Sequence, residues 1–182
     1  PVHILSHLAC ADDLESDFTL EQRKIFDSCV KSISGLKSLA NSAGIFCFPE
    51  AHYDVVRPGI ALYGVSPSSH IKASDLGLKP VMTLKTQLMA IRTLKKGASV
   101  GYGRRFICPE KMPIGVIAMG YGDGYPRTAQ DGTPILVNDK RCQVVGRVSM
   151  DMATIDLRAC PGAKVGDPVV LWGERLPIEE VA

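Results

Sequence analysis

The sequence predicts an α/β segment followed by an all-β domain. In residues 1–70, short apolar runs alternate with a helical pattern, which is typical of strand–helix–strand units. In residues 71–182, short strand patterns alternate with turn residues and little helical periodicity remains. Residues 66–69, Ser-Pro-Ser-Ser, have the composition of a linker and separate the two patterns. We therefore expect two domains, residues 1–70 and residues 71–182.

One clear helix is predicted in the first segment. Thr19 and Gln22 fit a capping box, with Thr19 at the N-cap. Gly35 is a residue type that commonly ends a helix. The apolar residues that recur on one helical face between them are Ile25, Phe26, Cys29, Val30 and Ile33.

Three short strands surround this helix in the prediction. The apolar runs are residues 2–5, 36–40 and 55–57, and a short or broken helix is expected over 43–53 because Pro49 interrupts it. This order implies a parallel sheet with right-handed crossovers. Three parallel strands cannot bury both faces of a sheet alone. We therefore expect the chain to be a fragment of a longer protein.

The second segment reads as strands and turns. Asn138-Asp139 is a hairpin signal between two of these strands. Near the end, Pro177 followed by acidic residues predicts the start of a helix. The predicted strands are residues 82–90, 114–119, 134–137, 143–145, 153–157 and 169–172.

Composition excludes several classes of partner. The net charge of +2 is too small for a nucleic-acid-binding surface. No apolar stretch reaches the roughly 20 residues that a membrane span needs. The six cysteines are scattered without a C-x-x-C pair, which disfavours zinc and a disulfide scaffold. We expect reduced thiols in the cytoplasm, no metal, no nucleic acid and no membrane.

Polar residues follow each predicted strand of the first segment. His7 follows the first strand, Asn41 and Ser42 follow the second, and Arg57 ends the third, before the potential anion-binding backbone of residues 59–60. Taken singly, a structural histidine, a capping serine and a surface arginine are commoner explanations. However, the carboxyl ends of parallel strands share one edge, where α/β folds place their sites. The pattern therefore points to one ligand.

The stretch MGYGDGYPR, residues 119–127, follows the apolar run 114–118. Its glycines would let the loop enter a confined pocket with Tyr121, braced by Asp123 or Arg127. The alternative is a glycine-rich hairpin that contains a core tyrosine.

Six strings together resemble the alanine racemase family of pyridoxal-phosphate enzymes. They are SHLACADD, LANSAG, VVRPGIALYGVSP, VGYGRRF, MGYGDGYPR and GRVSMDM, in that order. The resemblance implies the last strands and helices of a (β/α)8 barrel in residues 1–70. It also implies a mainly β C-terminal domain that carries the catalytic tyrosine in residues 71–182.

The resemblance also implies which residues hold the cofactor, pyridoxal 5'-phosphate. Ser42 and the backbone of Gly59 and Ile60 would bind the phosphate, with Asn41 beside them. Arg57 would face the pyridine nitrogen. Because the pKa of a guanidinium exceeds about 12, Arg57 cannot give that nitrogen a full proton. The ring then withdraws electrons less strongly, which disfavours side reactions.

The family's catalytic and substrate-binding positions can be placed in the same way. Tyr121 would be the catalytic tyrosine, with His7 linking it to Arg57. Met150 and Asp151 would lie near the substrate, and Arg147 would line the entrance. Racemisation needs a base on each face of the reacting carbon. The ordinary tyrosine pKa is about 10, so nearby cations must lower it for this role.

The implied activity is the interconversion of L-alanine and D-alanine, which supplies D-alanine for peptidoglycan. The implied assembly is a homodimer in which Tyr121 acts in the partner's active site. The family's Schiff-base lysine, in a KANAYGHG-like stretch, has no counterpart in this sequence, so we expect the chain alone to be inactive. Two alternatives stay open: a racemase for serine, lysine or many amino acids, and a non-catalytic phosphate-binding fragment.

Overall fold

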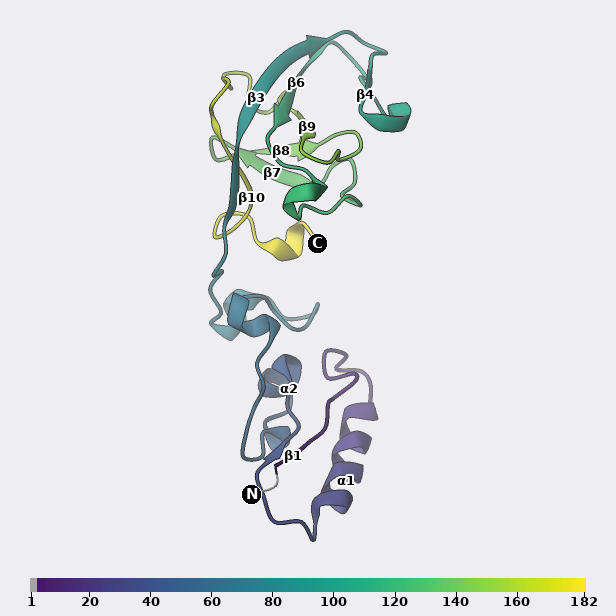
Figure 1. Ribbon diagram of the computed structural model, residues 1–182, viewed down its shortest axis with the longest axis vertical. Helices are drawn as coiled ribbons and strands as arrows, with labels where there is room; N and C mark the ends of the chain where they lie inside the picture. Colours follow the sequence, from purple (N-terminus) through teal and green to yellow (C-terminus); the bar gives the residue numbers. More distant parts are fainter. Residues whose placement is uncertain (1–2) are drawn as a thin grey trace. The chain divides into compact units, whose positions relative to one another are not determined.

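A computed structural model describes residues 3–182 and divides the chain into two compact units, with the boundary between Val81 and Met82 (Figure 1). The first unit is α/β and the second is mainly β, in the order that the sequence predicts. Along the described residues, no helix combines the length and apolar character that crossing a bilayer requires.

The first unit contains one parallel strand pair with a helix between its strands. β1 (Ile4–Leu5) pairs with β2 (Lys37–Ser38), and α1 (Phe18–Val30) connects them. The predicted first strand is confirmed for these residues, while Val2 lies outside the described part. The buried core of this unit consists of Leu8, Ala11, Phe26, Val30, Leu39, Ala43 and Ala51.

The predicted ends of α1 are wrong. Asp17 is the N-cap and makes no side-chain cap bond, while Thr19 lies inside the helix with its hydroxyl buried and unpaired. Gln22 turns to the preceding loop instead of the helix end. The helix ends at Val30, before Gly35. Tertiary contacts with that loop thus override the local capping pattern.

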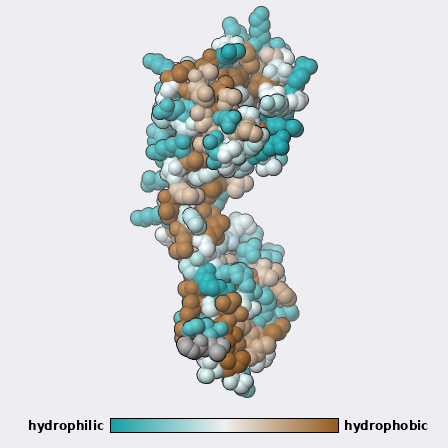
Figure 2. All heavy atoms as spheres, viewed as in Figure 1, coloured by the Kyte–Doolittle hydropathy of each residue, from teal (hydrophilic) through white to brown (hydrophobic). Residues whose placement is uncertain are grey.

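The predicted apolar face of α1 is only partly buried. Phe26 and Val30 enter the core, whereas Ile25 is 61% exposed and Ile33 is 42% exposed. Together with Leu5 of β1 they line a shallow apolar groove. Figure 2 shows brown, hydrophobic atoms on the surface of this unit.

The segment after β2 begins with the predicted broken helix. α2 (Ser42–Cys47) stops before Pro49. The predicted third strand over 55–57 is wrong, because this segment forms no ladder. It only makes single bonds to the β2 region, among them Arg57 N–H to the carbonyl of Ala40 at 3.0 Å. The 3₁₀ helices of the chain are η1 (Pro49–Ala51), η2 (Ile60–Tyr63), η3 (Ala73–Leu76), η4 (Tyr102–Arg104), η5 (Tyr121–Asp123) and η6 (Ile178–Glu180).

The second unit is built on a closed antiparallel barrel of six strands in the order β10-β3-β6-β9-β8-β7. Each predicted strand corresponds to one of them, with shifted ends. The strands are β3 (Leu84–Leu94), β6 (Met112–Ile117), β7 (Pro134–Val137), β8 (Lys140–Val144), β9 (Ala153–Asp156) and β10 (Pro168–Trp172). A separate small pair, β4 (Ser99–Val100) and β5 (Phe106–Ile107), was not predicted, because two-residue strands leave no periodic pattern.

The predicted hairpin joins β7 to β8. Asn138 has φ 49° and Asp139 has φ 63°. Two consecutive residues in the left-handed region are what a two-residue type I′ turn requires. The predicted helix start at Pro177 is confirmed as the single turn η6.

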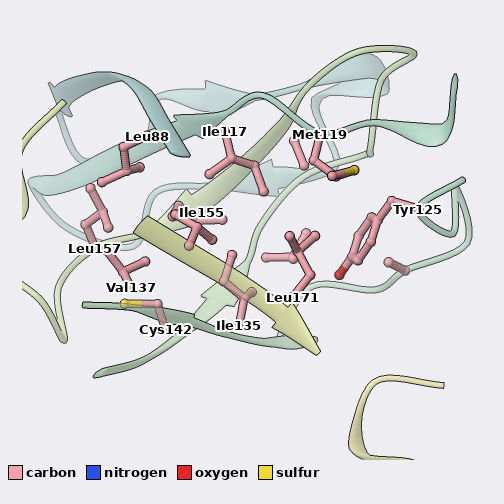
Figure 3. Packing of buried hydrophobic residues seen from close by; sticks show 14 of the residues in the cluster. Leu88, Ile117, Met119, Tyr125, Ile135, Val137, Cys142, Ile155, Leu157 and Leu171 are labelled. Carbon is pink, nitrogen blue, oxygen red and sulfur yellow. The ribbon is translucent and has the colours of Figure 1, made fainter. Parts of the chain in front are cut away.

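Alternate side chains of the barrel strands fill its interior. Figure 3 shows Leu88, Ile117, Ile155 and Leu171 gathered between the strands. Gly115 of β6 faces this interior, and a methyl group there would lie 2.8 Å from Leu88 Cδ2 and 2.9 Å from Ile155 Cγ1. The barrel is therefore packed too tightly at this point for any side chain.

This packing predicts that Gly115→Ala lowers the free energy of unfolding by about 1–3 kcal/mol, the usual cost of an extra methyl group in a full core. The measurement is urea denaturation followed by the fluorescence of Trp172, the only tryptophan, which packs against the barrel core. Gly162→Ala is the matched control, because a Cβ there meets nothing within 4 Å. Equal stability of the two variants would contradict the prediction.

Candidate active site

Polar groups from three segments meet at the carboxyl ends of β1 and β2. His7 follows β1, Asn41 and Ser42 begin α2 after β2, and Arg57 lies beyond η1. Asn41 Nδ2 lies 3.4 Å from His7 Nε2, and Arg57 Nη2 lies 3.3 Å from His7 Nδ1. The structure thus brings these sequence-predicted residues of the first unit together.

Arg57 is half-buried and held by neutral oxygens. Its Nη1 donates to Ser38 Oγ at 2.6 Å, and its Nη2 donates to the Ser6 carbonyl at 2.6 Å. No carboxylate among the described residues pairs with it. A guanidinium held in this way keeps a full positive charge and spare donors for a ligand.

His7 meets a donor at each ring nitrogen. Asn41 is oriented by two bonds, from Gly44 N–H to its Oδ1 at 2.9 Å and from its Nδ2 to the Leu8 carbonyl at 3.2 Å. Its amide nitrogen therefore faces the ring. Because a guanidinium can only donate, a hydrogen bond from Arg57 requires His7 Nδ1 to accept; a neutral ring then carries its proton on Nε2, and the Asn41 amide is a neighbour at 3.4 Å without a hydrogen bond to it. The Nε2–H remains available to another acceptor.

Ser42 and the segment after Arg57 form a small anion cradle. The Ser42 hydroxyl is buried and accepts from Gly59 N–H at 2.7 Å and from Ala61 N–H at 3.4 Å. The predicted donors were Gly59 and Ile60. The structure adds Ala61 and places Ile60 at the start of η2 with its side chain 49% exposed. Two N–H groups beside a hydroxyl are suitable donors for a phosphate group.

Sequence reasoning missed two residues that position this cluster. The Gln22 side chain accepts from Ala9 N–H at 2.9 Å and donates to the His7 carbonyl at 3.1 Å, so it fixes the loop that carries His7. Ser38 is buried and orients Arg57. Gln22 was assigned to a capping box, and Ser38 lay within an apolar run, so neither had a signal of its own.

The second unit carries the glycine-rich loop with Tyr121. The loop lies against residues 149–151: Tyr121 N–H donates to the Ser149 carbonyl at 3.0 Å and Gly122 N–H donates to the Met150 carbonyl at 2.8 Å. A Cβ on Gly120 would lie only 2.1 Å from the Met150 oxygen. The motifs MGYGDGYPR and GRVSMDM therefore form one surface.

Several predicted residues are exposed on this surface. Tyr121 is 37% exposed, and the Arg127 guanidinium lies 5.3 Å from its ring centroid, a cation–π arrangement. Met150 is 55% exposed and Asp151 is also exposed. Asp123 accepts from Gly120 N–H at 2.9 Å and so braces the loop.

A second tyrosine loop, from the string VGYGRRF, lies beside the predicted Arg147 and carries Tyr102, a residue for which the sequence predicted no role. Tyr102 follows Gly101, whose Cβ position is 3.1 Å from Arg147 N, and the two residues line the same pocket. The Tyr102 side chain is 70% exposed. Its tyrosine-glycine pattern in VGYGRRF repeats that of MGYGDGYPR. That repetition was the signal for a second candidate.

Tyr125 anchors the Tyr121 loop in the barrel core. Its side chain is 1% exposed, and its ring stacks on Trp172 with centroids 6.1 Å apart and planes at 12°. Figure 3 shows it among the core residues. Its hydroxyl has no hydrogen-bond partner among the described residues, and burial raises its pKa to about 12.

The fold and the two surfaces define a class of protein: an α/β unit with a donor-lined strand edge, followed by an antiparallel barrel domain. Family models identify it further. The alanine racemase N-terminal domain matches residues 1–67, and the alanine racemase C-terminal domain matches residues 81–182. The chain belongs to the alanine racemase family.

Individual relatives agree. The chain is 54% identical over its whole length to the alanine racemase of Nitrosococcus oceani and 50% identical to that of Vibrio cholerae. It spans about half the length of these curated relatives, 51% and 50%.

Solved structures give the same fold. The biosynthetic alanine racemase of Pseudomonas aeruginosa matches 99% of this chain with a TM-score of 0.95 and 47% identity, over 50% of its own length. The Bartonella henselae alanine racemase, solved with covalently bound pyridoxal phosphate, matches 98% of this chain with a TM-score of 0.85 and 34% identity, also over 50% of its own length.

The buried Tyr125 hydroxyl predicts a loss of stability in alkali. The folded state keeps this group neutral because its pKa is raised to about 12, whereas the unfolded value is about 10. Between pH 10 and pH 12 only the unfolded state loses this proton. The free energy of unfolding is therefore unaffected by this group below pH 10 and falls by roughly 2 kcal/mol as the pH rises towards 12. Tyr125→Phe should remove that loss and leave stability at pH 8 unchanged or higher, because it deletes an unpaired hydroxyl.

The measurement is urea denaturation of each variant at pH 8 and pH 11. Tyr63→Phe is the control, because that side chain is 55% exposed. The same alkaline loss in Tyr125→Phe as in the unmodified protein would disprove the assignment.

Proposed function

We propose that the complete protein is an alanine racemase, which interconverts L-alanine and D-alanine with pyridoxal 5'-phosphate. The observation that carries the proposal is the strand-end cluster, in which Arg57 without a carboxylate and the Ser42 cradle lie at one sheet edge. The membership of the family supports the same activity. In the cell, the enzyme would work in the cytoplasm and supply D-alanine for peptidoglycan.

We also propose the domain arrangement of the family. Residues 1–70 would form the last strands and helices of a (β/α)8 barrel, and residues 71–182 the C-terminal domain. The parallel β1–α1–β2 order supports this, as does the position of the polar residues at the carboxyl ends of the strands.

The residues present fit the cofactor. Ser42 and the N–H groups of Gly59 and Ala61 would bind its phosphate, with Asn41 holding the neighbouring loops together and Ile60 presenting its own N–H. Arg57 would donate to the pyridine nitrogen without protonating it. When bound, the cofactor supplies an electron-withdrawing ring that makes the α-hydrogen of the substrate acidic.

His7 would connect Arg57 to the acid–base tyrosine. Its Nδ1 accepts from Arg57, so its Nε2–H can donate to a tyrosine oxygen. A donor from a ring next to a guanidinium stabilises a phenolate, which favours proton acceptance near neutral pH.

Two tyrosines of the second unit compete for the acid–base role. The sequence assigns it to Tyr121, and that assignment stays a prediction. The structure favours Tyr102, because this residue is 70% exposed and its ring makes no aromatic or cation–π contact with the described residues, while the Tyr121 ring lies under Arg127. A proton carrier must reach the substrate with a free hydroxyl. We therefore propose that Tyr102 transfers the proton and that Tyr121 lines the pocket.

The neighbouring surface would bind alanine. Met150 would contribute its backbone N–H, Asp151 would limit the pocket, and Arg147, exposed beside Tyr102, would line the entrance. We propose a homodimer in which each subunit's tyrosine loop enters the partner's site, since a two-fold interface presents the same patch in both directions. The cofactor-bearing lysine would come from sequence that this chain does not contain, so the chain alone should not racemise alanine.

The tyrosine assignment predicts different losses for two matched variants of the complete enzyme. Tyr102→Phe should lower kcat by about 10²–10⁴-fold, the usual effect of removing a positioned acid–base group. Tyr121→Phe removes the same atom from the neighbouring loop and should lower kcat much less. The measurement is kcat and KM for both enantiomers, with α-proton exchange for each enantiomer.

A larger loss of kcat in Tyr121→Phe than in Tyr102→Phe would assign proton transfer to Tyr121. Wild-type rates in both variants would show that neither tyrosine transfers the proton. Mixing Tyr102→Phe subunits with subunits that lack the cofactor-bearing lysine tests the dimer. Activity should return, because each heterodimer then contains one intact site. No recovery despite confirmed subunit exchange would place the tyrosine in its own subunit's site.

The cradle predicts that Ser42→Ala weakens cofactor binding by roughly 10–100-fold, because a hydrogen bond to a charged phosphate is lost. The measurement is fluorescence titration of the cofactor-free complete enzyme with pyridoxal phosphate. Ser28→Ala is the control, because that exposed hydroxyl bonds only to the Ile25 carbonyl of its own helix. Equal affinities would show that Ser42 does not hold the phosphate.

A further inference from the structure

Asp131 contacts two other loops of the second unit through one carboxylate. Its Oδ1 accepts from Gly146 N–H at 2.6 Å, directly before Arg147. Its Oδ2 lies 3.5 Å from Arg105 Nε, at the end of the loop that carries Tyr102. Asp131 itself follows the Tyr121 loop, and Arg105 Nη2 also donates to the Ala129 carbonyl there at 3.4 Å. One charged group thus joins three functional loops.

The Asp131 turn is itself firmly attached to the barrel. Gly132 N–H donates to the Val144 carbonyl of β8 at 2.9 Å, and Thr133 closes the turn through bonds with Gln130. The carboxylate therefore has a fixed base. Its bond to a backbone N–H is charge-assisted and short, which makes it stronger than an ordinary surface contact.

The Tyr102 loop needs an external restraint. Gly101, Gly103 and Arg104 all have positive φ, 74°, 70° and 51°. Positive φ costs conformational energy at Arg104 but not at the glycines, so it is the Arg104 backbone that its surroundings must hold. The β4–β5 pairing closes the base of the loop, and Arg104 Nε donates to Ser99 Oγ. The bonds of Arg105 tie this hairpin to the segment of Ala129 and Asp131, while Val100 and Phe106 pack in an apolar cluster with Val145.

We propose that Asp131 and Arg105 are positioning residues for proton transfer. They fix the Tyr102 loop against Arg147 and the Tyr121 loop, so that the hydroxyl of Tyr102 is held at one distance from the substrate carbon. The inference rests on the proposed function, because it concerns the geometry of that reaction. A misplacement of about 1 Å costs on the order of 100-fold in rate, so a loop restraint matters even without substrate contact.

An ordinary ion pair would not have this effect. Exposed pairs contribute little to stability, and Arg105 and Asp131 are 30% and 33% exposed. Their effect instead comes from the fork of Arg105, which pairs with the Asp131 carboxylate at 3.5 Å and donates to the Ala129 carbonyl at 3.4 Å. Lysine cannot reproduce that fork.

The test compares variants of the complete enzyme. Arg105→Ala and Asp131→Asn should each lower kcat about 10-fold with little change in KM, and Arg105→Lys should fall between Arg105→Ala and wild type. Asp131→Asn keeps an acceptor for Gly146 N–H, so the fold should persist. Hydrogen exchange by mass spectrometry should show faster exchange in residues 100–106 in both variants. The double variant should lose no more than either single variant, because one restraint is removed.

The matched control is Arg175→Ala, which breaks the 2.6 Å pair with Asp139 at a 64% exposed position. It should change neither kcat nor exchange in residues 100–106. Wild-type kcat and unchanged exchange in Arg105→Ala and Asp131→Asn would overturn the proposal, as would a fall in thermal stability with no faster exchange in this loop. If the unmodified complete enzyme does not racemise alanine, the proposed function fails, while the exchange data still decide whether the restraint exists.

Discussion

Close approach of backbone to backbone is the constraint on which the second unit's functional surface depends. Gly120 lies so near the Met150 carbonyl that any side chain would overlap it, while Gly101, with φ 74°, approaches Arg147 less closely, its Cβ position being 3.1 Å from Arg147 N. Contacts of this kind need glycine on one side, and they join loops without side chains between them. Tyr102, Tyr121 and Met150 are thereby displayed on neighbouring loops. The barrel supports these loops, and the buried Tyr125 anchors the Tyr121 loop in the barrel core.

The first unit has a different arrangement, a sheet edge at which hydrogen-bond donors outnumber acceptors. Arg57, Asn41 and the N–H groups of Gly59 and Ala61 all donate into the region around His7 and Ser42. A serine hydroxyl, backbone carbonyls and the His7 ring accept from these donors, and Arg57 has five N–H groups in all. An anionic ligand with several acceptor oxygens completes such an arrangement. The oxygens of Ser38 and Ser6 accept from Arg57, which is how a half-buried arginine persists without a carboxylate partner among the described residues.

Local sequence signals predicted the elements whose cause is local. Asn138-Asp139 determines its own turn, and Pro49 breaks its own helix. The failures have distant causes. Thr19 lost its capping role because Gln22 bonds the loop after β1, and residues 55–57 stayed irregular because they bond β2 only singly. Strand-end patterning located the first cluster, since parallel strands align their ends. The resemblance gave the acid–base role to Tyr121 and none to Tyr102, and no sequence pattern could reveal how exposed each ring is, because exposure is a tertiary property.

The Asp131 carboxylate shows why positioning residues escape sequence reasoning. Arg105, Asp131 and Gly146 come from three turns, and no periodicity or motif relates them. Catalytic side chains are recognisable because their chemistry restricts the residue type, whereas a restraint needs only a charge and an acceptor at suitable positions. The need for one is nevertheless visible in the backbone, because Arg104 is a non-glycine residue with positive φ, a conformation that persists only where its surroundings hold it. A non-glycine residue with positive φ, such as Arg104, therefore marks a loop whose restraining groups no motif reveals.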